Sequence, residues 1–262
     1  MKTWRLAAAI SFIAIVYSGN VRAFSESDAM AALVTAYPDA LLKYEGRTLH
    51  WRDGTVTEIE PDDVRKSFEQ SLRAASLLDQ LRIPYPRGVL ESPPPVNVDP
   101  GRFRNVAFFR KMYGNCWRGE VTPRLVPIVW LPKSWNYMIR ATSVNGVAQR
   151  LVTISNEIEQ LPEKIRRAAY PIGGAYTCRT IADSGQPSMH AYGAAIDMNV
   201  AMADYWYWQR SASGALSYRN RMPNELVEIF ERNGFIWGGK WNHFDTMHFE
   251  YRPELLELAK RR

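Results

Sequence analysis

The sequence predicts an α+β protein in which short strands and helices are interleaved. Three observations carry this prediction. Apolar residues recur at helical spacing in several segments, residues 194–200 and 247–251 alternate apolar and polar positions as strands do, and Asp53-Gly54 is a strong two-residue hairpin signal. The chain has 262 residues, 46% of them hydrophobic and 23% charged, so it can bury a substantial core. This composition excludes a disordered, collagen-like or coiled-coil protein.

The first 23 residues have the pattern of an export signal. Lys2 and Arg5 precede an uncharged apolar run over residues 6–17, and Val21-Arg22-Ala23 places small residues at the −3 and −1 positions of a signal-peptidase site. The apolar run is shorter than the about 20 residues that a membrane-spanning helix needs. We therefore expect cleavage after Ala23, no stable membrane insertion after signal removal, and a periplasmic or secreted mature protein.

The charge balance argues against a nucleic-acid partner. Loss of Lys2, Arg5 and Arg22 with the signal lowers the formal net charge from +6 to +3, and the basic run at residues 260–262 is short. Mild positive charge suits attraction to an anionic cell-wall polymer. The sequence leaves the oligomeric state open.

The N-terminal part is predicted to combine helices with a hairpin. Residues 25–36 form a short helix, and residues 48–51 and 55–57 flank the hairpin turn. A further helix follows Pro61-Asp62-Asp63 and ends before Ile83-Pro84, and its apolar face consists of Val64, Phe68, Leu72 and Ala75. Ser92-Pro93-Pro94-Pro95 is the clearest linker. We therefore expect a helix and hairpin extension with its proline-rich linker over residues 24–100, and a main domain over residues 101–262.

The main domain is predicted to begin with a buried strand over residues 125–131. A helix running to about residue 160 follows, with an apolar stripe of Val147, Leu151, Ile154 and Ile158. Pro223 opens another helix with Leu226, Ile229 and Phe230 on its buried face, and Asn233-Gly234 closes it. Gly238-Gly239 is interpreted as a turn before the last strand.

The two cysteines, Cys116 and Cys178, both lie in the mature chain. In an oxidising compartment they can form one disulfide, which in a loop of this length contributes about 4 kcal/mol to stability. Two buried free thiols remain the alternative, because the sequence does not show that their Cα atoms are close.

The residues that indicate chemistry lie near the two alternating segments. In residues 194–200 the apolar side chains face one way and Asp197 the other, and His190 lies just before this strand. In residues 247–251, His248 and Glu250 alternate with apolar residues. If the two strands pair, Asp197 and His248 share a face, and two imidazoles with one carboxylate form a three-ligand zinc site with an open position. Spacing alone favours another interpretation, in which His190 and His248 are hydrogen-bonded structural residues.

Further candidates surround this group. Asp245 lies three residues before His248, where it can act as a general base, and Ser188 and Glu250 can orient metal ligands through hydrogen bonds. Two interpretations are open for His243: it can line a substrate cleft, or it can be a solvent-exposed histidine in a loop. Core packing is the default interpretation of the nearby aromatic residues, of which one or two can flank a substrate groove: Tyr205, Trp206, Tyr207, Trp208 and Trp241.

Several separated motifs resemble one family when they are taken together. Ser188-x-His190-x-x-Gly193-x-Ala195-x-Asp197, followed by Asp245-x-x-His248-Phe249-Glu250, resembles the signature of VanY-like D-alanyl-D-alanine carboxypeptidases. This family of zinc peptidases also includes L-alanyl-D-glutamate endopeptidases. Upstream, Arg179 stands where the family carries an arginine at the end of a strand. The resemblance covers roughly residues 165–255 and does not extend to residues 24–120.

The resemblance implies a role for each motif residue. His190, Asp197 and His248 would hold Zn²⁺, Asp245 would take a proton from the attacking water and pass it to the leaving amine, and Arg179 would stabilise the oxyanion. The implied fold is hedgehog-like or D-alanyl-D-alanine-peptidase-like, a small antiparallel sheet that carries the zinc site and is packed by helices.

The implied substrate is a peptidoglycan stem peptide. D-alanyl-D-alanine carboxypeptidase activity is the main hypothesis, and L-alanyl-D-glutamate endopeptidase activity is its alternative within the same chemistry. Two alternatives are not enzymes. One is a wall-binding protein with a structural zinc site, and the other is a metal-free binding module. The sequence contains no Ser-x-x-Lys motif, which argues against a serine-type penicillin-binding enzyme.

Overall fold

The computed structural model describes residues 24–61, 66–211 and 216–261. The predicted signal peptide lies outside the described residues, as do Asp62, Asp63 and Val64 of the predicted second helix. Within the described ranges, no helix combines the length and the apolar character that crossing a membrane requires.

The described residues form eight α-helices and eight strands in three small antiparallel sheets, which confirms the α+β prediction. The helices are α1 (Glu26–Ala36), α2 (Phe68–Arg73), α3 (Leu77–Leu81), α4 (Val106–Tyr113), α5 (Val147–Ile158), α6 (Glu163–Arg166), α7 (Asn224–Arg232) and α8 (Pro253–Ala259). The strands are β1 (Leu41–Glu45), β2 (Thr48–Trp51), β3 (Val56–Glu58), β4 (Leu125–Trp130), β5 (Tyr137–Thr142), β6 (Ala195–Asp197), β7 (Phe235–Trp237) and β8 (His248–Tyr251).

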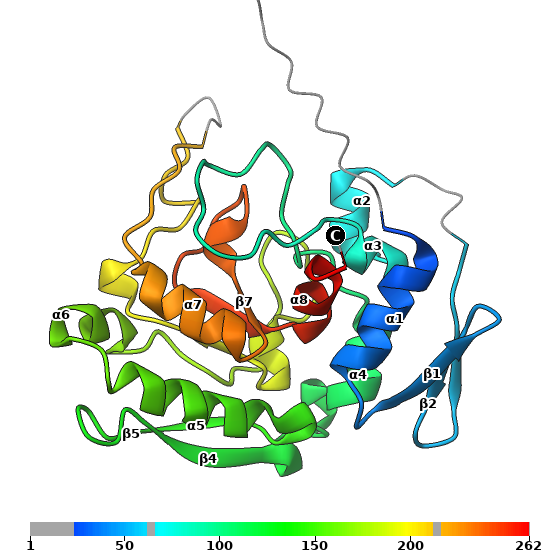
Figure 1. Ribbon diagram of the computed structural model, residues 1–262, viewed down its shortest axis with the longest axis horizontal. Coiled ribbons are helices and arrows are strands. Elements are labelled where there is room, and N and C mark those ends of the chain that lie inside the picture. Colours follow the sequence, from blue (N-terminus) through cyan, green and yellow to red (C-terminus); the bar gives the residue numbers. More distant parts are fainter. Residues whose placement is uncertain (1–23, 62–65, 212–215, 262) are drawn as a thin grey trace, which may run out of the picture.

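The three sheets are separate in space and are joined by helices (Figure 1). The first has the strand order β1-β2-β3, the second is the β4-β5 hairpin, and the third has the order β6-β8-β7. Helix α5 packs along β4 and β5, and α1 packs between the first sheet and α8 (Figure 1). The third sheet carries the residues that the sequence singled out as metal ligands.

Several predicted elements are confirmed with their caps. Helix α1 begins after Ser25, whose side chain accepts a hydrogen bond from the Asp28 backbone N–H. Strands β2 and β3 form the predicted hairpin around Asp53-Gly54, with Leu49 opposite Thr57. In α5, the predicted stripe of Val147, Leu151, Ile154 and Ile158 is buried. Helix α7 begins after Pro223, which is its N-cap and not its first helical residue, and ends at the Asn233-Gly234 turn.

Two parts of the N-terminal region differ from the prediction. The helix expected to run past Ala75 is interrupted, because Ser67 and Ser76 each form a capping box and start the separate helices α2 and α3. Strand β1 was not predicted, and it extends the hairpin to a three-stranded sheet. Only Ser71 of α2 is buried, so this helix lacks the continuous apolar face that the spacing indicated.

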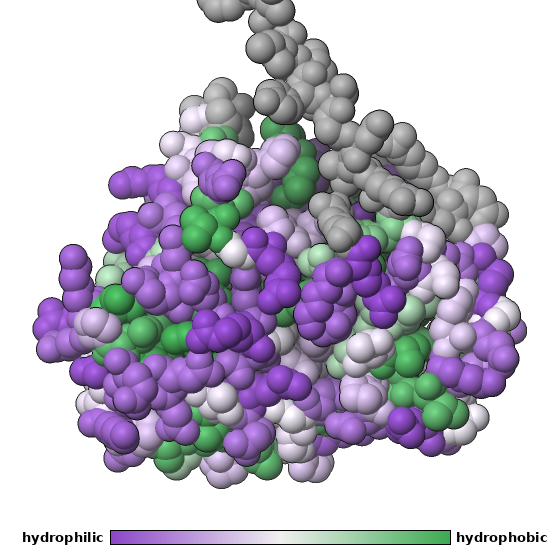
Figure 2. Space-filling model, in the orientation of Figure 1, coloured by the Kyte–Doolittle hydropathy of each residue, from purple (hydrophilic) through white to green (hydrophobic). Residues whose placement is uncertain are grey.

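One hydrophobic core includes residues from Ala29 in α1 to Leu258 in α8. The phenol of Tyr37, the residue that caps the C-terminus of α1, donates a hydrogen bond to Glu254 Oε2 (2.6 Å), and the Gln80 amide of α3 donates to Glu254 Oε1 (3.3 Å). The N-terminal region therefore contacts buried charge in the last helix, although the division of the chain near residues 91–100 stays a prediction. The face seen in Figure 2 is mostly hydrophilic with small hydrophobic patches, as on most globular proteins.

Cys116 and Cys178 form a disulfide, with their Cα atoms 5.8 Å apart. The bond joins the 3-10 helix Cys116–Arg118 to the loop that precedes Arg179 and closes a loop with a sequence separation of 62. It thereby restrains the segment that carries a predicted site residue.

Replacing both Cys116 and Cys178 with Ser should lower the free energy of unfolding by about 4 kcal/mol, because the unfolded chain regains the entropy that the cross-link removes. Urea unfolding of the oxidised protein and of the double variant measures this difference. Equal transition midpoints for the two proteins would contradict the prediction.

Candidate metal centre and active-site cleft

Strand pairing brings two predicted ligands face to face. Strands β6 and β8 are antiparallel, and Asp197 lies directly opposite His248 in their register. Directly opposite residues project from the same face of a sheet, so both side chains point to one side. His190 reaches this point from the 3-10 helix Met189–Tyr192, which precedes β6.

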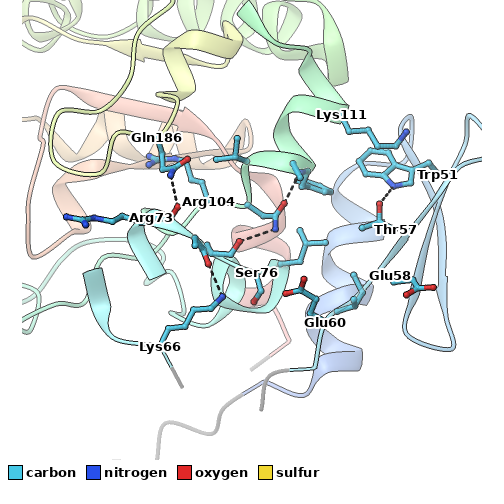
Figure 3. Close-up of a pocket in the computed structure, with 18 residues that line it drawn as sticks. Trp51, Thr57, Glu58, Glu60, Lys66, Arg73, Ser76, Arg104, Lys111 and Gln186 are labelled. Carbon is cyan, nitrogen blue, oxygen red and sulfur yellow. Dashed lines mark hydrogen bonds between the residues drawn. The ribbon is translucent and has the colours of Figure 1, made fainter. Parts of the chain in front are cut away.

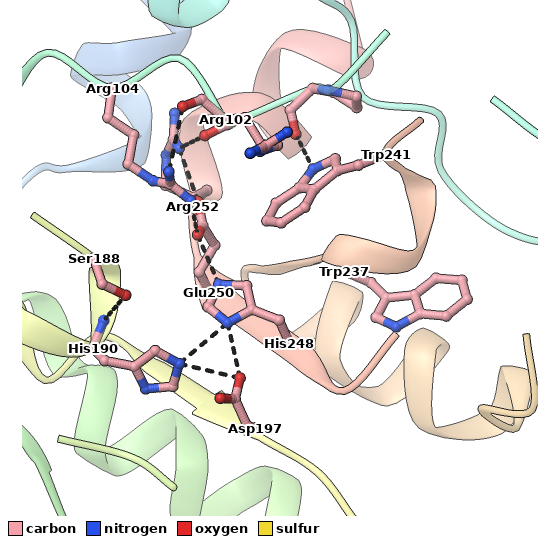
Figure 4. A network of polar contacts seen from close by, with 12 residues as sticks. Arg102, Arg104, Ser188, His190, Asp197, Trp237, Trp241, His248, Glu250 and Arg252 are labelled. Carbon is pink, nitrogen blue, oxygen red and sulfur yellow. Dashed lines mark hydrogen bonds and ion pairs between the residues drawn. The ribbon is translucent and has the colours of Figure 1, made fainter. Parts of the chain in front are cut away.

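Three ligand atoms converge from these residues (Figure 4). His248 Nδ1 lies 2.9 Å from Asp197 Oδ1, His190 Nε2 lies 3.1 Å from the same oxygen, and the two imidazole nitrogens are 3.2 Å apart. Both histidines are buried, and Asp197 is half-buried. His190, Asp197 and His248 therefore form a group that can hold a metal ion.

The outer hydrogen bonds of both imidazoles indicate which nitrogens carry protons. His190 Nδ1 contacts the carbonyl oxygen of Ala175, which only accepts, so Nδ1–H is the donor. His248 Nε2 contacts Glu250 Oε2 at 2.9 Å, and this carboxylate also accepts. In the neutral rings, lone pairs of His190 Nε2 and His248 Nδ1 therefore face each other beside a carboxylate oxygen. A positive charge between them, either a metal ion or a proton on one imidazole, stabilises such an arrangement.

The spacing of the three atoms fits zinc. In tetrahedral coordination with bonds of about 2.0–2.1 Å, neighbouring ligand atoms lie about 3.3 Å apart. The observed separations of 2.9 to 3.2 Å are close to this value. Two imidazoles and one carboxylate also match the ligand set of zinc sites that keep a fourth position open.

The pKa values of His248 and Asp197 both indicate that this group of residues favours positive charge. Burial disfavours the imidazolium of His248, but hydrogen bonds with Asp197 and Glu250 outweigh it and raise the pKa of His248 to about 10. Burial likewise acts to raise the pKa of Asp197, yet His190 and His248 hold that pKa well below its usual range. In the absence of metal, a proton on His248 supplies the charge that a metal ion would supply.

Glu250 connects His248 to two buried arginines. Its Oε2 contacts the Arg104 guanidinium as well as His248, and its Oε1 accepts from Arg252 at 3.0 Å. Burial acts to raise the pKa of Glu250, but Arg104, His248 and Arg252 together hold that pKa well below its usual range. Glu250 is therefore an ionised carboxylate that orients His248, as its predicted role requires.

Replacing Glu250 with Gln should weaken zinc binding by about 10- to 100-fold, because the amide no longer holds His248 as a charged acceptor does. Competition with a fluorescent zinc chelator measures the affinity. Glu254→Gln is the matched control, since Glu254 is also buried and pairs with Arg252 but has no contact with His248. Equal zinc affinities for the two variants would contradict a ligand-orienting role.

The residues around His190 explain two positions of its motif. The Ser188 hydroxyl caps the 3-10 helix by accepting from the His190 backbone N–H at 3.3 Å. Gly193 ends that helix at a φ of +68°, and a Cβ there would lie 2.6 Å from Leu125 and 3.0 Å from the Thr142 nitrogen. Only glycine fits both this conformation and this close approach to β4 and β5.

A cleft of about 300 Å³ opens beside the metal-binding group. Its lining includes each of the other predicted site residues except Glu250: Arg179, Ser188, Trp241, His243 and Asp245. Arg102, Arg104 and the aromatic residues of the segment 205–208 other than Tyr207 complete most of the wall. The structure thus gathers residues that are far apart in the sequence around one cavity.

Asp245 presents a carboxylate to the cleft. Its Oδ1 is buried and has no hydrogen-bond partner among the described residues. Burial, together with the negative charge of Asp197, raises the pKa of Asp245 to about 6. The backbone holds this residue from two sides, because its N–H donates to Gly238 O at 3.0 Å and Tyr205 pairs with it in a β-bridge. A side chain at Gly238 would lie 2.6 Å from Asp245 O.

Arg179 is exposed and lines the same cleft. Across residues 24–61, 66–211 and 216–261, its guanidinium forms no ion pair and no side-chain hydrogen bond. Arg179 lies in a loop that continues to the β-bridge of Thr180 with Pro187, not at the end of a strand as the resemblance implied. Its charge is available to a ligand.

The remaining candidates are held firmly at the cleft wall. His243 Nδ1 contacts Asp99 Oδ2 at 2.7 Å, and its ring stacks on Phe68 with centroids 5.4 Å apart. Trp241 is buried and donates from Nε1 to Pro100 O at 2.6 Å. His243 is therefore a cleft residue and is not part of a solvated loop.

Sequence reasoning missed the contribution of residues 99–104. Arg102 pairs with buried Asp99 (2.8 Å) and with Asp183, while Arg104 pairs with Glu250. Both arginines line the cleft, although Arg104 is separated from Glu250 by 146 residues in sequence. No local motif marks them, and the only signal is two arginines in a short segment after the linker.

A larger cavity of about 490 Å³ lies between the β2-β3 hairpin and α4 (Figure 3). Its lining includes Trp51, Lys111 and Gln186, and it shares Arg104 with the cleft. Within the described part of the chain, the group of His190, Asp197 and His248 is the one found to converge as metal ligands, and it lies by the smaller cleft. The smaller cavity is therefore the candidate active site.

Residues 182–251 match the family model described as D-alanyl-D-alanine carboxypeptidase. The match confirms the resemblance seen in the motifs and supports a peptidase. It includes His190, Asp197, Asp245 and His248, and Arg179 falls just outside it. No curated protein and no solved structure matches the chain at a significant level.

Proposed function

We propose that this protein is an exported zinc peptidase that removes the terminal D-alanine from peptidoglycan stem peptides. The observation that carries the proposal is the convergence of His190 Nε2, Asp197 Oδ1 and His248 Nδ1 within 3.2 Å, beside a cleft that holds an unpartnered carboxylate oxygen. The match of residues 182–251 to D-alanyl-D-alanine carboxypeptidases supports the choice of substrate.

Zinc held by these three residues would act as a Lewis acid and make hydroxide available at neutral pH. Asp245 supplies the base. Its free Oδ1 accepts a proton from the attacking water, and the same oxygen then donates that proton to the leaving amine. A pKa of about 6 for Asp245 suits both transfers, because the group is largely ionised at neutral pH and still binds a proton readily.

Arg179 supplies fixed positive charge. Its exposed guanidinium faces the cleft, where it can bind the carbonyl oxygen that becomes negative in the transition state. Arg102 lines the same cleft, but its guanidinium already pairs with Asp99 and Asp183, so its charge is neutralised within the protein.

Digestion of purified muropeptides by residues 24–262 tests the proposal, with mass spectrometry of the products. We expect loss of a terminal alanine that a chelator abolishes and added zinc restores. Cleavage between the first two stem residues would assign endopeptidase activity instead. Intact muropeptides in the presence of stoichiometrically bound zinc would overturn the peptidase assignment on this substrate and favour a binding role.

A further inference from the structure

Residues 85–100, which include the predicted proline-rich linker, lie along the loop that precedes Asp245, and we call them the strap. Four consecutive residues of that loop, from Lys240 to His243, each form a hydrogen bond with the strap. No strap residue falls within the matched family segment. A simple connection between two parts of a chain does not need a contact with every residue of one loop, so the strap has a further role.

Lys240 is anchored by a completely paired ammonium group. It donates to Pro86 O and Gly88 O, each at 2.6 Å, and its third donor contacts a glutamate of α7. Only 1% of the Lys240 side chain is exposed. Lys240 ends the short turn in which Gly238 O accepts the Asp245 backbone N–H at 3.0 Å. The strap therefore acts on Asp245 through this turn.

Asp99 holds the loop from its other end. Its Oδ1 accepts the His243 backbone N–H at 3.0 Å, and its Oδ2 accepts from His243 Nδ1 at 2.7 Å. Asp99 is fully buried, and Arg102 donates to the same Oδ2 at 2.8 Å. One carboxylate of the strap thus fixes both the backbone and the ring of a residue that stands two positions before Asp245.

The two residues between these anchors are held as well. Trp241 Nε1 donates to Pro100 O at 2.6 Å, and the Asn242 backbone N–H donates to Val98 O at 3.0 Å. The Asn242 side chain accepts from the Asn97 backbone N–H at 3.1 Å. The loop is therefore bound to the strap along its whole length, by backbone and side-chain groups alike.

We propose that the strap is a positioning element that sets where the Asp245 carboxylate lies relative to the metal-binding group. The inference rests on the proposed function, since it concerns the base of that reaction. Asp245 Oδ1 has no hydrogen-bond partner among the described residues, so the backbone on either side of Asp245 must hold it in place. A displacement of about 1 Å can slow a reaction about 100-fold, which makes a rigid loop necessary for the reaction.

Hydrogen exchange read by mass spectrometry tests the hold of the strap without depending on catalysis. In Asp99→Ala, the backbone amides of residues 240–246 should exchange about tenfold faster or more, because the loop loses two hydrogen bonds to a charged group. Asp79→Ala is the matched control. Asp79 is also buried and pairs with the arginine three residues later, but its partners lie between residues 66 and 82. Its variant should leave exchange over residues 240–246 unchanged.

Kinetics on a sugar-free stem peptide test whether this hold serves Asp245. Asp99→Ala should lower kcat by about 10- to 100-fold while KM and zinc affinity stay within a few-fold. Asp99→Asn should recover part of the loss, because its amide oxygen still accepts the His243 backbone N–H. In an Asp245→Asn background, Asp99→Ala should cause no further loss, since the base that the strap positions is absent.

The outcomes separate the strap from the proposed peptidase. If the wild type cleaves no stem peptide, the peptidase is wrong, and the exchange rates still decide whether the strap holds the loop. Unchanged exchange over residues 240–246 in Asp99→Ala, or an equal fold-loss of kcat in both backgrounds, would disprove the positioning role. Asn242→Ala removes strap contacts without uncovering a buried charge, so it should show the same pattern with a smaller loss and replaces Asp99→Ala if that variant fails to fold.

Discussion

Asp245→Asn should lower kcat on a stem-peptide substrate by about 100- to 10,000-fold while zinc still binds, because the amide cannot accept the proton of the attacking water. The substitution keeps the size of the side chain, and the backbone contacts of Asp245 with Gly238 and Tyr205 do not involve the carboxylate. Steady-state kinetics beside metal analysis of the same sample measure both quantities.

Asp204→Asn is the control for this substitution. Asp204 is also a buried carboxylate near β8, but it pairs with Arg221 and does not line the cleft. Its variant should retain kcat within a few-fold. Unchanged activity of the Asp245 variant would exclude a base role and leave Asp245 as a structural group.

His190→Ala should remove both zinc and activity. It takes away one of three converging ligands, and the loss of zinc affinity should exceed the about 10- to 100-fold that an outer hydrogen-bond partner contributes. We choose His190 because His248 also pairs with Glu250, and its removal would leave a buried carboxylate without one of its partners. Zinc content per chain is measured by atomic emission after dialysis.

His50→Ala provides the comparison, since His50 lies in β2, outside the third sheet and its cleft. That variant should keep one zinc ion per chain and full activity. Circular dichroism of the His190 variant checks that it remains folded. Full zinc content in a folded His190 variant would mean that the metal binds elsewhere.

The local geometry of the candidate site follows closely from sequence patterns. Two short alternating segments predicted that Asp197 and His248 would share a face if their strands paired, and in the structure β6 and β8 do pair, with these two residues opposite each other. Alternation specifies which side chains share a face, so a correct pairing brings the two ligands together without further information. His190 could be placed because it precedes β6 by only a few residues.

Other features depend on contacts that no local pattern encodes. Arg104 meets Glu250 across a sequence separation of 146, and Asp99 meets His243 across 144. The break between α2 and α3 was missed for a different reason, since Ser76 directly follows the last apolar residue of the predicted helix face, Ala75, and starts a new helix as its N-cap. The apolar spacing indicated which residues could share one face of a helix, but it did not indicate where that helix ends.

The contacts of Glu254 limit how this chain can be divided or recombined. Glu254 receives hydrogen bonds from Tyr37 at the end of α1 and from Gln80 in α3, and it shares Arg252 with Glu250, the carboxylate that contacts His248. A fragment that starts after the proline-rich linker would lose the first two donors and uncover the side of α8 that α1 covers. Deletion mapping, domain exchange and minimal expression fragments therefore need residues 24–100, even though none of them falls within the matched family segment.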